Sequence, residues 1–351
     1  MGVRTATATE SRPDDPAPWF SGLQAMADLV TPMTLRVAAT LRLPDLIVTG
    51  VDTAVALATK TGTDAQALAR VLRHLVAVGI CTEDGTGRFG LTELGDRLRA
   101  TGPGDARSWL DINGAVGRAD LSIVHLMDVV ATGAPSYPRL YGKDFWDDLD
   151  ANPALSTTFD EQMSAGAAVK TRTLVTAYSW DQLSHVADVG GGNGTLISAI
   201  LAANPGLRGT LVDRPGPVSG SRAVFAAAGV TDRATAVAQS FFDPLPTGAD
   251  VYLLSGVLHD WDDERATALL RRTAEAAGEQ GRVVVVESLF DGSAREIPKT
   301  VMDLRMLAFQ YGRARTADEL RGLAEQAGLT NTAEIPIAHP HTLLEFTPAG
   351  R

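Results

Sequence analysis

A histidine and a glutamate each follow a short strand-like run in the C-terminal half of the chain. The run at 251–254, Val-Tyr-Leu-Leu, precedes His259, and the four valines at 283–286 are followed directly by Glu287. An unperturbed histidine titrates near about 6.5, so its neutral ring can accept a proton from a hydroxyl group at neutral pH. A phenol, with a pKa of about 10, is a poor nucleophile until it is deprotonated. The pattern predicts that His259 is a general base for a phenolic hydroxyl and that Glu287 orients its ring and stabilises the imidazolium.

Three glycines with the spacing G-x-G-x-G follow another strand-like run, at 186–189. Gly190, Gly192 and Gly194 stand between this run and a helical stretch that begins near Thr195. Glycine lets the backbone approach a ligand closely, and the turn falls at the carboxyl edge of the predicted sheet. The alternatives are the turn of a nicotinamide enzyme, which has the spacing G-x-G-x-x-G, and a tight turn that binds no ligand.

Two carboxylates flank this glycine turn. Asp188 precedes it, where a carboxylate can face the cationic end of S-adenosylmethionine (SAM). Asp213 ends the next strand-like run, about twenty residues further on. An acid at that place can accept hydrogen bonds from both ribose hydroxyls of a nucleoside. Together with the glycine spacing, the two acids favour SAM as the cofactor.

Short β-rich runs alternate with helical stretches from near Ser184 onward, which predicts an α/β fold with a parallel sheet. The four runs that define this pattern are 186–189, 210–212, 251–254 and 283–286.

The N-terminal part has the order helix, helix, hairpin. Helical spacing covers about 19–49, a short helix follows the candidate caps Asp52 and Thr53, and a further helix spans about 64–78. Turn residues at 84–87 separate two short apolar runs, which predicts a β-hairpin. This is the order of a winged helix, a unit that serves either DNA binding or dimerisation and the covering of a substrate site. The acidic composition favours the second role.

The pattern divides the chain into four parts. We expect a disordered tail at 1–18, a winged-helix domain at 19–103, a helical linker and substrate-lid region at 104–183, and a cofactor-binding catalytic domain at 184–351.

Composition limits the partners. The 351 residues carry a formal net charge of -11, whereas nucleic acids and anionic membrane surfaces attract basic segments, so we expect neither as a partner. No apolar run approaches the roughly 18 residues that a membrane span needs. The single cysteine, Cys81, cannot form an internal disulfide, and we expect a buried thiol in a cytoplasmic protein. We expect no metal site.

The chain resembles the caffeic-acid-type O-methyltransferases of plants and their bacterial relatives that act on aromatic polyketides. The likeness is strongest to naphthoic-acid O-methyltransferases of enediyne pathways, and it covers nearly the whole chain, from about Leu23 to Phe346. The motifs that carry it are the glycine turn at 188–194, Phe-Phe-Asp-Pro-Leu-Pro at 241–246, Leu-His-Asp-Trp at 258–261, Met-Asp-Leu-Arg-Met-Leu at 302–307 and Gly-Arg-Ala-Arg-Thr at 312–316.

The resemblance implies a homodimer formed by the N-terminal winged-helix domain, and a C-terminal Rossmann-like domain of the class I methyltransferase type. It implies that Phe241 packs near the adenine of SAM. Ser240 stands where an adenine-contacting Asp is usual, and Ala314 stands where a second Glu beside the histidine is usual, which leaves Glu287 as the orienting acid. The predicted cofactor site comprises Asp188, Gly190, Gly192, Gly194, Asp213, Ser240, Phe241 and Ser255. The predicted substrate pocket comprises Phe159, Met163, Asp260, Met302 and Met306.

We therefore expect a SAM-dependent O-methyltransferase that methylates a phenolic hydroxyl of a small aromatic natural product, of polyketide, naphthoate or anthraquinone type, in antibiotic biosynthesis. Holding the two reactants in line supplies much of the expected acceleration. Carbon methylation through the ortho carbon of the same phenolate is the alternative within this class. A nicotinamide-dependent reductase and a winged-helix regulator are the alternatives outside it.

Overall fold

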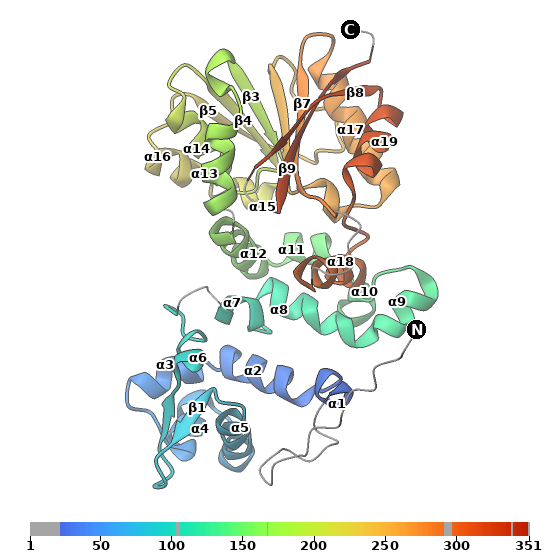
Figure 1. Ribbon diagram of the computed structural model, residues 1–351. Coiled ribbons are helices and arrows are strands. Elements are labelled where there is room, and N and C mark those ends of the chain that lie inside the picture. Colours follow the sequence, from blue (N-terminus) through green and yellow to red (C-terminus); the bar gives the residue numbers. More distant parts are fainter. Residues whose placement is uncertain (1–21, 103–105, 167, 291–296, 338–339, 350–351) are drawn as a thin grey trace, which may run out of the picture. The chain divides into compact units, whose positions relative to one another are not determined.

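The computed structural model describes residues 22–102, 106–166, 168–290, 297–337 and 340–349. They belong to two compact units, the first ending at Asp111 and the second beginning at Ile112 (Figure 1). The tail predicted at 1–18 lies outside the described residues. The helical region that precedes the sheet belongs to the same compact unit as the sheet, whereas the sequence suggested a boundary near Ser184.

The first unit contains the predicted helices and hairpin. Thr53 and Asp64 each accept a backbone N–H at a helix start, which confirms Thr53 as a cap. The predicted β-hairpin is confirmed, and in its antiparallel register Cys81 faces Leu91. The elements are α1 (Leu23–Met26), α2 (Val30–Thr40), α3 (Leu43–Val48), α4 (Ala54–Thr61), α5 (Ala65–Ala77), β1 (Cys81–Glu83), β2 (Phe89–Leu91), α6 (Glu93–Asp96) and α7 (Ala106–Leu110).

The helical run predicted at 19–49 is divided into three helices. Between α2 and α3, Arg42 adopts a left-handed backbone conformation with φ of 54°, which cannot continue an α-helix. Pro44 stands in the first turn of α3, where its fixed φ suits a new helix start. The apolar period was read correctly, but it does not reveal a one-residue change of direction.

The second unit opens with a series of short helices. Their shared core contains Tyr137, Phe145 and Leu149, all fully buried. The elements are α8 (Ala115–Asp120), η2 (Leu121–His125), α9 (Leu126–Thr132), α10 (Tyr137–Tyr141), α11 (Phe145–Ala151), α12 (Pro153–Gly166), α13 (Ala168–Ala177) and η3 (Trp180–Gln182).

A seven-stranded sheet follows, with the order β5-β4-β3-β6-β7-β9-β8. The first five strands in this order are parallel, and β9 and β8 continue the sheet in antiparallel pairing. The four runs predicted as strands are confirmed as β3, β4, β6 and β7, whereas β5 was missed because alternating alanines give it little apolar signal. The strands are β3 (His185–Val189), β4 (Arg208–Asp213), β5 (Ala234–Ala238), β6 (Val251–Ser255), β7 (Arg282–Ser288), β8 (Leu329–Pro336) and β9 (His341–Pro348).

Helices cover both faces of this sheet (Figure 1). Because side chains alternate along a strand, Tyr252 and Leu254 pack in one core and Val251 and Leu253 in the other. The helices between and after the strands are α14 (Thr195–Ala203), α15 (Pro215–Val218), α16 (Ser221–Ala227), η4 (Leu258–Asp260), α17 (Asp263–Ala277), α18 (Ile297–Phe309) and α19 (Ala317–Gln326).

Strand order fixes where a ligand can bind. The chain runs from β3 outward to β4 and β5, then returns to place β6 on the other side of β3. Connections that leave two neighbouring strands in opposite directions open a crevice at their carboxyl ends. The glycine turn follows β3 and η4 follows β6, so both predicted sites lie at this edge. None of the described helices has the length and apolar character that a membrane crossing requires.

Burial of Cys81 leads to a testable expectation. Its side chain packs in the core of the first unit, and burial raises the pKa of the thiol to about 11. A two-unit rise lowers the thiolate fraction at pH 8 by about 100-fold, so a thiol reagent should modify the native protein at least about 100-fold more slowly than glutathione. Modification should become fast in denaturant. Rapid labelling of the folded protein at pH 8 would contradict the burial.

Candidate active site

The glycine turn between β3 and α14 has a backbone that other residues cannot adopt without strain. Gly190, Gly192 and Gly194 all have positive φ, of 75°, 62° and 85°. A Cβ atom on Gly190 would lie 2.8 Å from a methyl group of Val257, so glycine is required there for space as well. The turn therefore keeps its backbone open at the carboxyl edge of the sheet.

Asp213, at the end of β4, is bonded to this turn. Its Oδ2 accepts a hydrogen bond from the backbone N–H of Gly192 at 2.7 Å, and its Oδ1 accepts one from that of Arg214 at 2.6 Å. Burial raises the pKa of Asp213, while these two hydrogen bonds oppose the rise. Each oxygen retains a further lone pair, so the carboxylate can still accept from ligand hydroxyls.

Two polar side chains at the same edge are buried without hydrogen-bond partners. Both carboxylate oxygens of Asp188 and the hydroxyl of Ser255 are in this state in the described part of the chain. Burial, and then the charge of Asp213, raises the pKa of Asp188 to about 7. A buried polar group without a partner is costly, and a bound cationic ligand would relieve that cost. The glycine turn, the Asp213 carboxylate that can accept from hydroxyl groups, and the unpartnered Asp188 carboxylate together suit a cationic nucleoside such as SAM.

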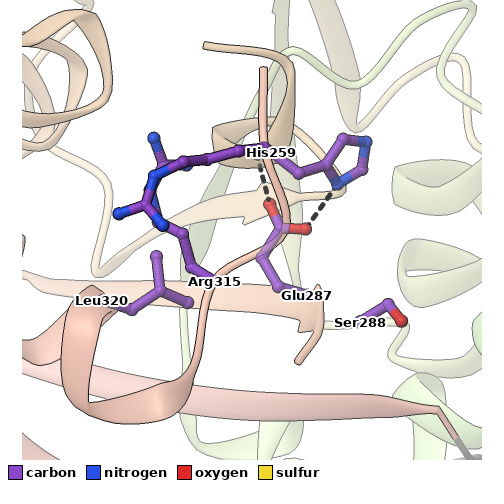
Figure 2. Close-up of a pocket in the computed structure, with 6 residues that line it drawn as sticks. His259, Glu287, Ser288, Arg315 and Leu320 are labelled. Atoms are coloured by element: carbon purple, nitrogen blue, oxygen red, sulfur yellow. Dashed lines mark hydrogen bonds and ion pairs between the residues drawn. The ribbon is translucent and has the colours of Figure 1, made fainter. Parts of the chain in front are cut away.

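The predicted base and its orienting acid are in direct contact. Nδ1 of His259, in η4, lies 2.6 Å from Oε2 of Glu287, at the end of β7. The other oxygen of Glu287 accepts hydrogen bonds from the backbone N–H groups of Val257, Leu258 and His259, at 3.1, 2.8 and 3.4 Å. Figure 2 shows the Glu287 carboxylate pointing at the His259 side chain. One carboxylate therefore holds both the imidazole and the loop that carries it.

Charge around His259 raises its proton affinity. Burial disfavours the imidazolium, but the charges of Glu287 and Asp260 outweigh this effect and raise the pKa of His259 to about 9. Burial also disfavours the Glu287 carboxylate, yet its contacts with His259 leave the pKa of Glu287 below its usual value. Glu287 is therefore the acceptor, Nδ1 carries the proton, and Nε2 faces away from Glu287. The His259 side chain is 37% exposed.

Asp260 lies on the Nε2 side of the ring. Its Oδ1 is 3.4 Å from Nε2 of His259 and accepts a hydrogen bond from the Gln310 amide at 2.6 Å. The same amide lies 2.8 Å from the sulfur of Met306. Burial raises the pKa of Asp260 to about 6, against the opposing charge of His259. Ala314 stands where a second Glu beside the histidine is usual, but Asp260 supplies a second carboxylate there. This role of Asp260 was not predicted from the sequence.

Aromatic side chains pack around two of the predicted substrate residues, Phe159 and Met306. Phe159 packs edge to face on Phe145 and Trp146, in a cluster that also includes Met306. Trp146 in turn stacks on Trp261, next to the catalytic loop, with ring centroids 6.1 Å apart. Met163 and Met302 are 39% and 38% exposed, and no contact between them and these rings is resolved.

Phe241, predicted to lie near adenine, packs edge to face on Trp261 at 5.9 Å. Its neighbour Ser240 caps the following turn, because its hydroxyl accepts the backbone N–H of Phe242 at 3.2 Å. The aromatic wall formed by Trp146, Trp261 and Phe241 therefore runs from α11 to the turn after β5.

Several functional residues escaped the sequence-based prediction. Arg315, almost fully buried, donates to the backbone oxygens of Leu258 and Trp261 at 2.7 and 2.6 Å and thereby holds both ends of the His259 loop. Trp261 and Arg315 lie within recognised motifs, so their positions were available as signals. Trp146 lies in α11 and Gln310 directly follows α18, and nothing in the sequence there distinguishes them from core residues.

Comparison with known proteins supports the same assignment. Residues 123–330 match the description of an O-methyltransferase domain, and residues 23–101 match that of an O-methyltransferase dimerisation domain. The chain is 50% identical over 326 residues to the 2,7-dihydroxy-5-methyl-1-naphthoate 7-O-methyltransferase of Streptomyces carzinostaticus, covering 93% of this chain and 97% of that one. It is 45% identical over 337 residues to the aclacinomycin 10-hydroxylase of Streptomyces purpurascens, covering 93% and 89% of the two chains.

A solved structure shares the fold over almost its full length. It is an O-methyltransferase from neocarzinostatin biosynthesis in complex with SAM and 2-hydroxy-5-methyl naphthoic acid, with a TM-score of 0.89 and 48% identity, covering 93% of this chain and 99% of that chain. The chain thus belongs to the O-methyltransferase family, and it is a SAM-dependent O-methyltransferase.

Proposed function

We propose that the protein methylates a phenolic hydroxyl of an aromatic natural product, of naphthoate or related polyketide type, in antibiotic biosynthesis. The observation that carries this proposal is the His259–Glu287 pair, in which Glu287 holds Nδ1 and Nε2 lies on the side of Asp260. The names of the relatives support the aromatic substrate, because a naphthoate is the acceptor in one and is bound in another.

Bound SAM supplies an electrophilic methyl group on a sulfonium. We assign the holding of this cofactor to Asp188, Asp213, Ser255 and the backbone of the glycine turn, with Phe241 and Ser240 near the adenine. Asp213 accepts from the ribose hydroxyls while it keeps its hydrogen bond to Gly192. Asp188 offers a buried carboxylate directly before the turn, and both of its oxygens have no hydrogen-bond partner.

On the acceptor side, Nε2 of His259 removes the phenolic proton, and Glu287 stabilises the imidazolium that results. Asp260, held by Gln310, lies close enough to Nε2 to stabilise the same charge. Phe159, Met163, Met302 and Met306 are proposed to contact the aromatic ring. The reacting oxygen therefore receives its negative charge only where the base can reach it.

A hydroxylase among the relatives shows that one fold can carry another reaction. Product analysis separates the alternatives, since methylation adds a methyl group to oxygen or carbon and hydroxylation adds an oxygen atom. Incubation with labelled SAM and a panel of hydroxylated naphthoates and anthraquinones should give a labelled aryl methyl ether. A product methylated on carbon, or one that carries a new hydroxyl instead, would overturn the proposal.

Replacing the base should remove most activity without weakening cofactor binding. His259→Ala should lower the rate by about 10²–10⁴-fold at neutral pH, and the rate should recover as pH approaches the pKa of the phenol. In the wild type, the rate should rise with pH as His259 loses its proton, since only the neutral ring is a base.

Glu287→Gln should lower the pKa of His259 from about 9, because the main carboxylate beside it is gone. Its rate profile should shift to lower pH, with a milder loss than that of His259→Ala. The measurement is the pH–rate profile of all three proteins on one phenol. Wild-type rates for His259→Ala at neutral pH would show that proton removal by this ring is not required.

Asp213→Ala should weaken SAM binding at least about tenfold, since losing a charged hydrogen bond costs about 1.5–3 kcal/mol. Asp150→Ala is a matched control, because Asp150 is a carboxylate on the far side of Arg214 that does not bond to the glycine turn. Calorimetry should show near wild-type SAM affinity for the control. Equal affinities for both variants would refute the ribose assignment.

The protein is further proposed to be a homodimer through its N-terminal unit. Residues 23–101 match a dimerisation domain, and large apolar side chains are exposed around α1, with Leu23 at 76% and Met26 at 86%. Cytoplasmic location and the absence of a nucleic-acid partner remain predictions from the sequence.

Light scattering at micromolar concentration should give twice the mass of one chain. The double variant Leu23→Asp, Met26→Asp should shift the mass toward that of a monomer. Val55→Asp, at another exposed apolar position in α4, should leave the dimer intact. A wild-type monomer at this concentration would exclude the proposed assembly.

A further inference from the structure

Lys170, in α13, brings an ammonium group to the reacting centre. A Cβ atom placed on Gly256 would lie 3.4 Å from Nζ of Lys170 and 3.5 Å from Cε1 of His259. Gly256 follows β6 directly, at the edge where the glycine turn and the catalytic loop meet. The ammonium and the imidazole therefore approach the same point of the backbone.

Packing of the preceding helices sets the position of Lys170. The Asn193 side chain, in the glycine turn, donates to the hydroxyl of Ser164 at 3.2 Å and links the end of α12 to the turn. The C-terminal half of α13 is anchored by the indole of Trp180, which donates to the backbone oxygen of Leu174 at 3.0 Å. Since Leu174 is fully buried, α13 is a fixed support, and Lys170 stands one turn before Leu174.

The groups that face this ammonium are those proposed to serve the cofactor and the base. Asp188 on β3 and Glu287 on β7 attract it, and His259 on η4 is the cation that it repels. Burial lowers the pKa of Lys170, and the two carboxylates oppose that change. The charge of Lys170 in turn lowers the pKa of Asp188 and of His259. Among the described residues, no carboxylate lies within salt-bridge distance of Lys170. Its charge therefore influences Asp188, Glu287 and His259 together and is not neutralised by one partner.

We propose that Lys170 competes with the sulfonium of SAM for the carboxylates of Asp188 and Glu287, and thereby discriminates the charged cofactor from its uncharged thioether product, S-adenosylhomocysteine (SAH). The inference rests on the proposed cofactor site. SAM and SAH share every group except the methyl and its positive charge. A sulfonium held by these carboxylates and the Lys170 ammonium are like charges in a partly buried site and repel, whereas an ammonium beside a neutral thioether carries no such penalty. Lys170 therefore weakens SAM binding relative to SAH binding.

Calorimetric titration of SAM and of SAH into the full-length protein tests this. In Lys170→Met the ratio of the SAM Kd to the SAH Kd should fall roughly tenfold, because the repulsion of the sulfonium is gone. Lys170→Arg keeps the charge and should keep the wild-type ratio. Lys60→Met removes an exposed lysine in α4 and controls for net charge.

The pH dependence of the same ratio gives a second readout. In the wild type the ratio should fall as pH rises and Lys170 loses its proton, and in Lys170→Met this change should be absent. Asp188, Glu287 and His259 titrate in both proteins, so the difference between the two profiles isolates Lys170. Thermal unfolding of each variant checks that it is folded, and if Lys170→Met does not fold, Lys170→Gln takes its place in both measurements.

The outcomes are distinguishable. An unchanged ratio in Lys170→Met overturns the inference and leaves the cofactor site standing. An equal loss of both affinities also overturns it, since Lys170 would then bind a group that SAM and SAH share, such as the methionine carboxylate. A wild-type protein that binds neither ligand would remove the proposed cofactor site itself, and the inference with it.

Discussion

The carboxylate of Glu287 is the contact on which the active-site geometry depends. One oxygen holds the imidazole of His259, and the other accepts three consecutive backbone N–H groups of the loop after β6. Those N–H groups have no strand partner once β6 has ended, so without Glu287 they would be buried and unpaired. Arg315 complements Glu287, because it donates hydrogen bonds to carbonyl oxygens of the same loop. The loop is thus fixed from β7 on one side and from the segment before α19 on the other.

The acids at the carboxyl edge of the parallel sheet give the site an excess of negative charge. Asp188, Asp213 and Glu287 are buried there and Asp260 is partly buried, and burial raises the pKa of the three aspartates. The cations in the same region are few, and His259 gains its high pKa from this excess of negative charge. A site of this kind selects a cationic ligand without any direct ion pair. It also leaves the base too readily protonated, a state that an incoming positive charge would correct.

Much of this arrangement was predictable because it depends on local sequence. The strands are continuous apolar runs, and the turn needs glycines because its backbone has positive φ. Both features are therefore visible in the sequence. His259 and Glu287 could be placed because each follows such a strand. Gln310, Trp146 and Lys170 could not, since they lie in or directly after helices and reach the site only through tertiary packing. The break at Arg42 could not be predicted either, because the spacing of apolar residues does not reveal a single residue in the left-handed conformation.

The relatives show why family membership leaves the chemistry to individual side chains. One is an oxygen methyltransferase, one a hydroxylase and one an N,N-dimethyltransferase, all at 32% identity or more over most of this chain. A shared fold does not determine the reaction, which depends on individual side chains at the site. In this chain the proposed base is an imidazole backed by Glu287, with Asp260 at 3.4 Å from Nε2. A phenolate formed by this ring stays hydrogen-bonded through its oxygen to the imidazolium, which fixes the oxygen in place relative to the methyl group. The ortho carbon has no such contact, so the geometry of the base favours transfer to oxygen over transfer to carbon.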